Sequence, residues 1–169
     1  MSTVLQLVRT LSSRPVAELP AGVSVRNFSG SEDIVAWLKL RQQAFARQTV
    51  GVRAWDETDF AAEFLRKPWW NPRRMWIAEP TNDLPPVERS FIGAVTCAVR
   101  GVGPAAQPAV HWLVVHPRWR NRGVGRLLLN TLEAACWDSG QRTIVLETHI
   151  GWAAAVRLYQ SLGYRTVGD

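Results

Sequence analysis

The sequence has few of the residues that build disulfide scaffolds, metal sites or membrane spans. It contains two cysteines, Cys97 and Cys136, and three histidines in 169 residues. Two cysteines in apolar contexts on different elements lack both a disulfide framework and metal-ligand spacing. We therefore expect buried thiols, a reducing compartment and no metal. No apolar run approaches the roughly 18 residues that a membrane span needs, so we expect a cytoplasmic protein without membrane contact.

Lysine is scarce as well, because only Lys39 and Lys67 are present and arginine carries most of the net charge of +6. A basic chain suits nucleic acid or any other phosphorylated ligand. The arginines are scattered except for one dense run at Arg118, Arg120, Arg122 and Arg126. Such a compact run fits a polyphosphate better than a long duplex. Without a helix-turn-helix, zinc or RNA-binding signature, we expect no nucleic-acid partner.

The length of the chain suits one α/β domain with a substantial core. We expect an N-terminal arm over residues 1–20 and a single domain over residues 21–169. The arm has no acidic residue before Glu18, a composition that organellar transit peptides share. We interpret it as an ordinary arm that packs on the body or on a partner chain.

Alternation and helical spacing predict the remaining elements. Strands are expected over residues 23–28, 75–79, 91–99, 112–116, 143–148 and 164–167. A helix is expected after Ser29, which forms a capping-box pattern with Glu32, and a second short helix after Thr58. Further helices are expected over residues 124–137 and 152–162. This order predicts a largely antiparallel sheet with a later β–α–β unit.

The most informative stretch joins the strand at residues 112–116 to the helix that follows it. The strand ends at Pro117, and a basic turn then carries Gly123 and Gly125 into the helix. Unpaired backbone N–H groups and the positive end of the helix dipole meet at such a turn. Glycines let a ligand approach the main chain there. The pattern predicts an anion cradle.

The glycine spacing excludes two common phosphate loops. No lysine or hydroxyl residue follows Gly125, as a P-loop requires, and Leu128 stands where a dinucleotide fingerprint needs its third glycine. What remains is R-x-x-G-x-G, formed by Arg120, Gly123 and Gly125. This resembles the acetyl-CoA-binding motif of the GNAT superfamily of N-acetyltransferases. A turn that merely connects a strand to a helix is the alternative.

A second motif lies near the C-terminus and strengthens the resemblance. GNAT proteins typically carry N-x-x-A-x-x-L-Y-x-x-x-G-F/Y here. This chain matches it at Ala155, Leu158, Tyr159, Gly163 and Tyr164. Trp152 stands where the family has an asparagine that commonly helps to bind the cofactor. The segments AAVRLY and KPWWNP are also similar to mycothiol synthases, which have two tandem GNAT units where this chain has room for one.

The resemblance implies a GNAT fold of the α/β (α+β) class. We expect a mixed, mostly antiparallel sheet of six to seven strands and about four helices, splayed between the strands at 112–116 and 143–148. Acetyl-CoA would lie in the splay as a cosubstrate. Its pantetheine arm would meet the main chain of Leu113, Val114 and Val115. Its pyrophosphate would meet the turn formed by Arg120, Asn121, Arg122, Gly123, Val124, Gly125 and Arg126.

The family chemistry needs a base for the amine and a proton for the departing thiolate. Tyr159 matches the family's tyrosine near the coenzyme sulfur and is the candidate acid, with simple packing as its alternative role. Glu147 and His111 are the candidate bases because they stand on either side of the expected splay. Glu79 and His149 are weaker candidates.

Three functions remain open from the sequence. The first is transfer of acetyl from acetyl-CoA to a primary amine of a small molecule or peptide, by direct attack in a ternary complex. The second is a catalytically impaired GNAT-fold module that binds CoA, which the exchange of asparagine for Trp152 suggests. The third is a basic nucleic-acid-binding domain.

The acceptor site is expected over residues 48–74, where Trp55, Trp69 and Trp70 gather. These tryptophans predict either an aromatic wall for the acceptor or the edge of the core. A homodimer is left open.

Overall fold

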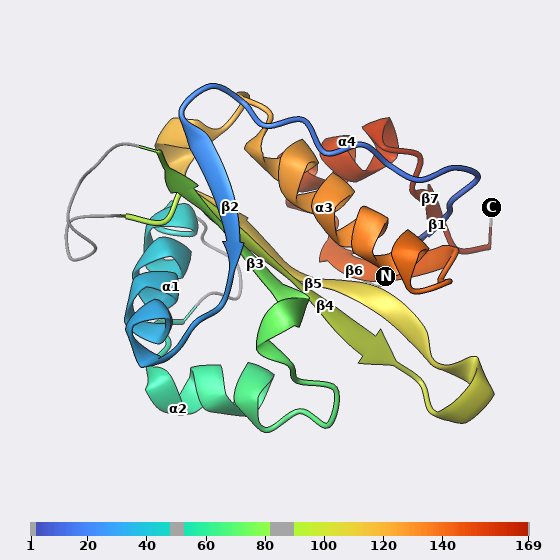
Figure 1. Cartoon of the computed structure of the whole chain (residues 1–169), viewed down its shortest axis with the longest axis horizontal. Coiled ribbons are helices and arrows are strands. Elements are labelled where there is room, and N and C mark those ends of the chain that lie inside the picture. Colours follow the sequence, from blue (N-terminus) through green and yellow to red (C-terminus); the bar gives the residue numbers. More distant parts are fainter. Residues whose placement is uncertain (1–2, 48–52, 82–89, 169) are drawn as a thin grey trace.

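The computed structural model describes residues 3–47, 53–81 and 90–168, which form one sheet covered by helices (Figure 1). The strands are β1 Val4–Thr10, β2 Val23–Asn27, β3 Met75–Pro80, β4 Gly93–Arg100, β5 Gln107–Val115, β6 Thr143–His149 and β7 Arg165–Thr166. The helices are α1 Ser31–Ala44, α2 Glu57–Phe60, α3 Val124–Asp138 and α4 Ala153–Ser161. A π-helical turn, Ala61–Leu65, continues α2.

The sheet has seven strands in the order β2-β3-β4-β5-β6-β1-β7. Every neighbouring pair is antiparallel except β5 and β6, which are parallel and in register only at Ala109 and Val145. Beyond that pair the two strands separate. This confirms the mixed, mostly antiparallel sheet and the splay that the motifs imply.

Each face of the sheet buries its own apolar cluster. One cluster, which includes Trp37, Phe60 and Phe64, packs α1 and α2 on the sheet. The other packs α3 and α4, with Leu128 and Leu132 of α3 fully buried. These leucines repeat at helical spacing, and burying each one stabilises the fold by about 1.5–3 kcal/mol.

The N-terminal segment differs from the expected arm, because Val4–Thr10 forms strand β1 between β6 and β7. Leu7 is the one fully buried residue of this strand, facing Leu146 and Thr166 in the register. A strand with a single buried apolar residue leaves almost no alternation in the sequence, which is why the pattern did not predict it. The strand at residues 23–28, expected to be first, is therefore β2.

The predicted helix caps were wrong in detail. Helix α1 follows Gly30, and Asp33 accepts the Ser29 N–H at 2.7 Å, whereas the pattern assigned that role to Glu32. Helix α2 begins at Glu57 after its N-cap Asp56, which forms a reciprocal capping box with Asp59, so Thr58 lies inside the helix. An aspartate caps as well as a serine or threonine does, and the sequence offered both types within one turn.

The two cysteines are buried and free, as expected. Cys97 of β4 and Cys136 of α3 converge, with their Sγ atoms 3.9 Å apart. In the described residues, no helix is long and apolar enough to cross a membrane. Most of the segment between the strands expected at residues 75–79 and 91–99 lies outside the described residues.

Candidate active site

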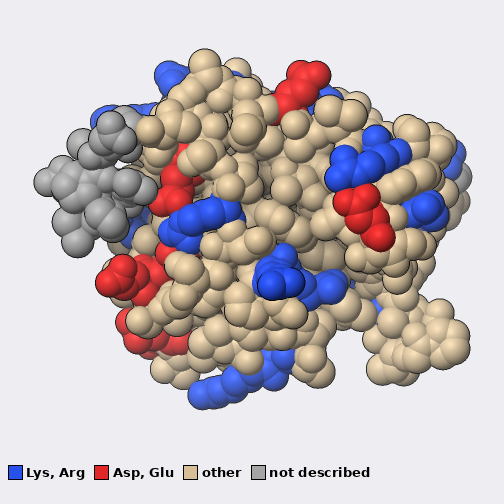
Figure 2. Space-filling model, in the orientation of Figure 1, with Lys and Arg blue, Asp and Glu red and all other residues tan. Residues whose placement is uncertain are grey.

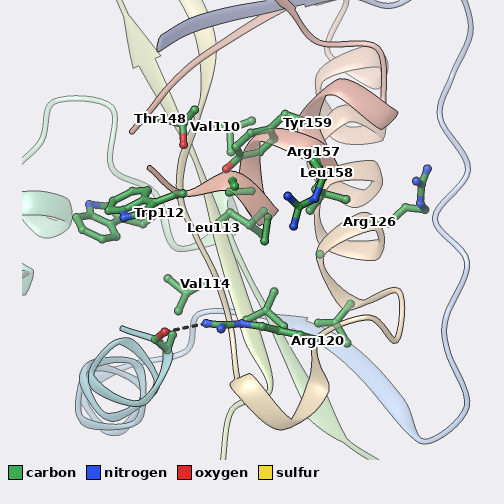
Figure 3. Close-up of a pocket in the computed structure, with 18 of the residues that line it drawn as sticks. Val110, Trp112, Leu113, Val114, Arg120, Arg126, Thr148, Arg157, Leu158 and Tyr159 are labelled. Carbon is green, nitrogen blue, oxygen red and sulfur yellow. Dashed lines mark hydrogen bonds between the residues drawn. The ribbon is translucent and has the colours of Figure 1, made fainter. Parts of the chain in front are cut away.

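A cavity of about 950 Å³ opens where β5 and β6 separate (Figure 3). Its walls come from the whole length of β5 between residues 110 and 115, the turn at residues 119–126, the end of β6 and the first two turns of α4. Every residue that the two sequence motifs assigned to the cofactor or to catalysis lines this cavity except Arg122. The cavity therefore unites segments that lie far apart in the sequence.

The edge of β5 that faces the cavity presents main-chain groups. The N–H of His116 donates to the Ile92 carbonyl at 2.8 Å, on the side of β4. Because successive residues of a strand alternate, Val114 also turns its main-chain groups toward β4. Leu113 and Val115 therefore turn theirs toward the splay.

A β-bulge interrupts β5 where this strand lines the cavity. Ala94 pairs with Val114 but Thr96 pairs with His111, so two residues, Trp112 and Leu113, stand opposite one. Trp112 takes a positive φ of 51°, which is rare for a bulky side chain. His111 and Trp112 consequently point to the same face of the sheet, where both contact aromatic rings of the α1–α2 cluster.

The start of α3 has uncompensated N–H groups. Its N-cap is Gly123 at a φ of 83°, a residue without a side chain that could cap the helix, and no acidic residue lies in the first turn. By contrast, α2 is capped by Asp56. The positive end of the α3 dipole thus meets the cavity without a protein anion.

Gly125 lies where helices α3 and α4 pack closely. A Cβ at this position would lie 2.8 Å from Cδ2 of Leu158, so glycine lets α3 and α4 approach closely. At Gly123 the nearest atom to such a Cβ is 3.7 Å away, and the positive φ is what favours glycine there.

The arginines of the basic run have different surroundings. Arg120 donates to the Ala44 carbonyl at the end of α1 (2.7 Å), so its guanidinium links the turn to α1 (Figure 3). Arg122 stacks on Trp119, with 5.1 Å from its Cζ to the ring centroid. Arg126 donates to Ser161 and points away from the centre of the pocket in Figure 3. On the face shown in Figure 2, basic side chains are scattered rather than gathered into one tract.

Arg157 was missed by the sequence reasoning. It stands on α4, two residues before Tyr159, and reaches into the pocket beside Leu113 in Figure 3. In the second motif, Arg157 occupies a position at which the family pattern allows any residue. Only the packing of α4 beside α3 brings this charge to the cavity.

Tyr159 is buried on α4, and its hydroxyl points into the cavity (Figure 3). Among the described residues the hydroxyl has no hydrogen-bond partner. Burial raises the pKa of Tyr159 above its ordinary value. The phenol is therefore neutral at physiological pH and holds a proton that it can donate.

The two candidate bases differ in their partners. Glu147 lies 3.2 Å from the Arg100 guanidinium and also accepts a long hydrogen bond from Gln6. The Nε2 atom of His111 lies 3.1 Å from Glu63, a residue that the sequence reasoning missed. Of the weaker candidates, Glu79 is ion-paired with Arg26 away from the cavity lining, and His149 accepts the Gly151 N–H at 2.9 Å.

Aromatic rings close the cavity on the side of α1. Phe45 lies 5.4 Å from Trp152, centroid to centroid, so a ring after α1 meets a ring before α4 across the splay. Trp55 packs on Trp112 at 4.8 Å, and Trp69 lies 5.6 Å from His111. The tryptophans thus belong to the packed cluster beside the site. Residues 48–52 of the expected acceptor region lie outside the described residues.

Three buried polar atoms of residues that line the cavity have no hydrogen-bond partner among the described residues: His111 Nε2, Thr148 Oγ1 and Trp152 Nε1. With the uncapped helix start and the open edge of β5, they give a row of unused hydrogen-bonding groups. Such a row fits an extended ligand that carries both anionic and amide groups. Acetyl-CoA has this chemistry. No cluster of metal-binding side chains is found within the described ranges.

Comparisons with known proteins identify the family of the chain. Residues 34–164 match the acetyltransferase (GNAT) family. The mycothiol acetyltransferase of Mycobacterium ulcerans is 29% identical over 174 residues, covering 96% of this chain and 53% of that protein. The chain spans about half the length of the curated relatives it matches.

Solved structures show the same fold. A GCN5-related N-acetyltransferase from Sphaerobacter thermophilus superposes with a TM-score of 0.67 at 21% identity, covering 96% of this chain and 48% of that chain. A structure from Salmonella typhimurium with its cofactor acetyl-CoA has a TM-score of 0.61 at 20% identity, covering 84% and 79% of the two chains. The chain therefore belongs to the GNAT acetyltransferase family, as its two sequence motifs predicted.

Proposed function

We propose that this chain transfers an acetyl group from acetyl-CoA to a primary amine of a small molecule or peptide, by direct attack in a ternary complex. The observation that carries the proposal is one continuous cavity, which joins the uncapped start of α3 to the hydroxyl of Tyr159. Membership of the GNAT family and the mycothiol acetyltransferase relatives support a small amine as acceptor.

The start of α3 would hold the pyrophosphate. Its backbone N–H groups near Gly123 and Val124 face the cavity without a side-chain cap. Arg157 adds a charge-assisted contact from α4. An anion at this position gains both hydrogen bonds and the favourable helix dipole.

The open edge of β5 would hold the pantetheine arm. Leu113 and Val115 turn N–H and carbonyl groups toward the splay, where β6 has moved too far away to pair with them. An arm with two amides satisfies these groups as a neighbouring strand would. The thioester is thereby aimed at the bulge.

The chemistry then needs three groups from the chain. Acetyl-CoA supplies an activated thioester carbonyl. The bulge at Trp112 and Leu113 frees a main-chain N–H that can stabilise the developing oxyanion. Tyr159 donates its phenolic proton to the departing thiolate, because its hydroxyl points into the cavity where the thioester would lie. A base removes the proton of the amine.

The test separates binding from turnover. We expect CoA to raise the melting temperature of the purified chain, because a ligand that binds only the folded state stabilises it. We also expect thiol release from acetyl-CoA to depend on an added amine from a panel of small amines and peptide N-termini.

Each outcome has one meaning. Stabilisation by CoA together with amine-dependent thiol release supports the transferase. Stabilisation with no release for any amine overturns it in favour of a module that binds CoA without turnover, the reading that Trp152 prompts. If CoA has no effect on melting, the cavity is not a CoA site.

A further inference from the structure

The carboxylate of Glu63 contacts both His111 and Trp112, the two side chains that the bulge turns to the same face of the sheet. Oε1 of Glu63 lies 3.1 Å from Nε2 of His111 and accepts the indole N–H of Trp112 at 3.2 Å. The imidazole N–H does not point squarely at the carboxylate, so the first contact is chiefly electrostatic. Glu63 thus joins the segment after α2 to the point where β5 is irregular.

The backbone around Glu63 is itself irregular. Residues Ala61–Leu65 form a π-helical turn, in which the Arg66 N–H donates to the Ala61 carbonyl at 2.8 Å. A π turn inserts one residue into a helix and rotates the side chains that follow, a feature frequent at functional sites. Here Phe64 is fully buried in the core while Glu63 reaches β5.

His111 stands in an aromatic enclosure with a single ionised neighbour in contact. The rings of Phe64 and Trp69 meet the imidazole edge-on at 5.4 and 5.6 Å, and the side chain is 17% exposed. The residue also lines the cofactor cavity. Nδ1 makes no hydrogen bond within the described part of the chain and carries a free lone pair when Nε2 faces Glu63.

The side chain of Glu63 is a carboxylate under the conditions in which it would stabilise a protonated imidazole. The contact with His111 lowers the pKa of Glu63 below its ordinary value, although burial acts in the opposite direction. The other charged groups whose fields reach Glu63 are Lys67, which also favours the carboxylate, and Arg41 of α1, which stacks on Trp55 and Trp112. A fixed anion beside an imidazole stabilises the imidazolium.

We propose that His111 takes the proton from the attacking amine and that Glu63 is the positioning residue that orients and stabilises its imidazole; this rests on the proposed function. The amine nitrogen bonds to the thioester carbon and gives one proton to Nδ1 of His111. The C–S bond breaks, and the thiolate takes the proton of Tyr159. The proton on His111 then returns through water to the Tyr159 phenolate, so the cycle closes without another reactant.

The experiment compares pH profiles of kcat/KM for amine-dependent thiol release in four variants. His111→Gln keeps a polar side chain but cannot accept a proton, so we expect a loss of about 100-fold or more and no acidic limb from this group. Glu63→Gln is expected to lose less than His111→Gln and to lower kcat with little change in the KM for the amine, because the imidazolium loses its anion while the base itself remains.

Of the remaining two variants, one is a control and the other tests the rival base. Glu57→Gln removes an exposed carboxylate from the start of α2 and should change neither rate nor profile. Glu147→Gln tests the rival base on β6 and should keep the acidic limb of the unsubstituted protein. CoA should stabilise all four variants equally, since β5 and α3 hold it through the backbone.

The outcomes are distinct from those of the proposed function. A chain that acetylates no amine ends both proposals together. An active chain in which His111→Gln keeps its rate, or Glu147→Gln loses the acidic limb, overturns only the assignment of the base. NMR of the His111 imidazole checks Glu63 without turnover: ring signals of His111 that are the same with and without Glu63→Gln reject the positioning role.

Discussion

Val110 and Val114 are four residues apart on one strand and yet are buried on opposite faces of the sheet. Val110 belongs to the cluster under α3, and Val114 belongs to the cluster under α1 and α2. In a regular strand, residues four apart share a face. The bulge at Trp112 and Leu113 adds the residue that reverses the alternation.

Because of this reversal, one short segment of β5 packs against the core and also lines the candidate site. Before the bulge the strand anchors the core beneath α3, and at the bulge it turns His111 and Trp112 toward the α1–α2 side. After the bulge it turns the main chain of Leu113 and Val115 toward the splay. Under the proposed function, cofactor and acceptor would approach the bulge from different sides.

Removing the phenolic hydroxyl tests the acid. We expect Tyr159→Phe to lower kcat about 100-fold with little change in the KM for acetyl-CoA, because the proton acts on the leaving group. The hydroxyl has no partner in the described residues, so the melting temperature should stay the same. Full activity in this variant would falsify the role of Tyr159.

The anion cradle is tested by placing a negative charge at Gly123. We expect Gly123→Asp to abolish the stabilisation by CoA, since a carboxylate at the helix start repels the pyrophosphate and occupies its donors. Gly123→Asn is the matched control because asparagine has the same shape, tolerates a positive φ and carries no charge. The measurement is the shift in melting temperature with CoA. Equal shifts in both variants would reject a phosphate site here.

Arg157 is expected to contribute more to binding than the arginines that the sequence singled out. Arg157→Ala should raise the KM for acetyl-CoA about tenfold, because it removes a charge-assisted contact that contributes about 1–2 kcal/mol. Arg118→Ala is the control, since Arg118 is exposed and does not line the cavity. Steady-state kinetics at fixed amine measures both. A larger effect at Arg118 would indicate that the phosphates bind on the outer side of the turn.

The sequence predicted the parts of the site that depend on local pattern. The strand, the turn and helix α3 follow from a proline, two glycines and helical spacing within twenty or so residues, and Tyr159 follows from the second motif. Glu63 and Arg157 could not be predicted, because their importance depends on which helix packs beside which strand. The bulge could not be predicted either. One extra residue in an apolar run changes the face of the sheet to which the side chains point, but it does not change the composition of the run.

Strand β1 was hidden for a different reason and leads to a prediction about stability. Arg9 of this strand forms an ion pair with Glu133 of α3, which is fully buried and also accepts the hydroxyl of Tyr164 at 3.1 Å. Removing one partner of a buried pair leaves an uncompensated charge. Arg9→Ala should therefore lower the free energy of unfolding by about 3 kcal/mol at neutral pH.

The pH dependence of this loss has a definite sign. Burial raises the pKa of Glu133 above its ordinary value even with Arg9 present, and removing Arg9 should raise it further. A carboxyl whose pKa is raised by folding contributes stability that is present below its unfolded pKa and is lost as pH rises through the folded pKa. The deficit of Arg9→Ala should thus be small at acidic pH and grow toward neutral pH.

Denaturant unfolding at pH 5 and pH 8 measures the deficit. Arg14→Ala is the matched control, because Arg14 forms an exposed pair with Asp138 on the same helix and its loss should not be measurable. Adding Glu133→Gln to Arg9→Ala should restore much of the stability and abolish the pH dependence, since glutamine keeps an acceptor for Tyr164 without the charge. A deficit that is the same at both pH values and survives the second substitution would mean that Arg9 stabilises β1 by packing alone.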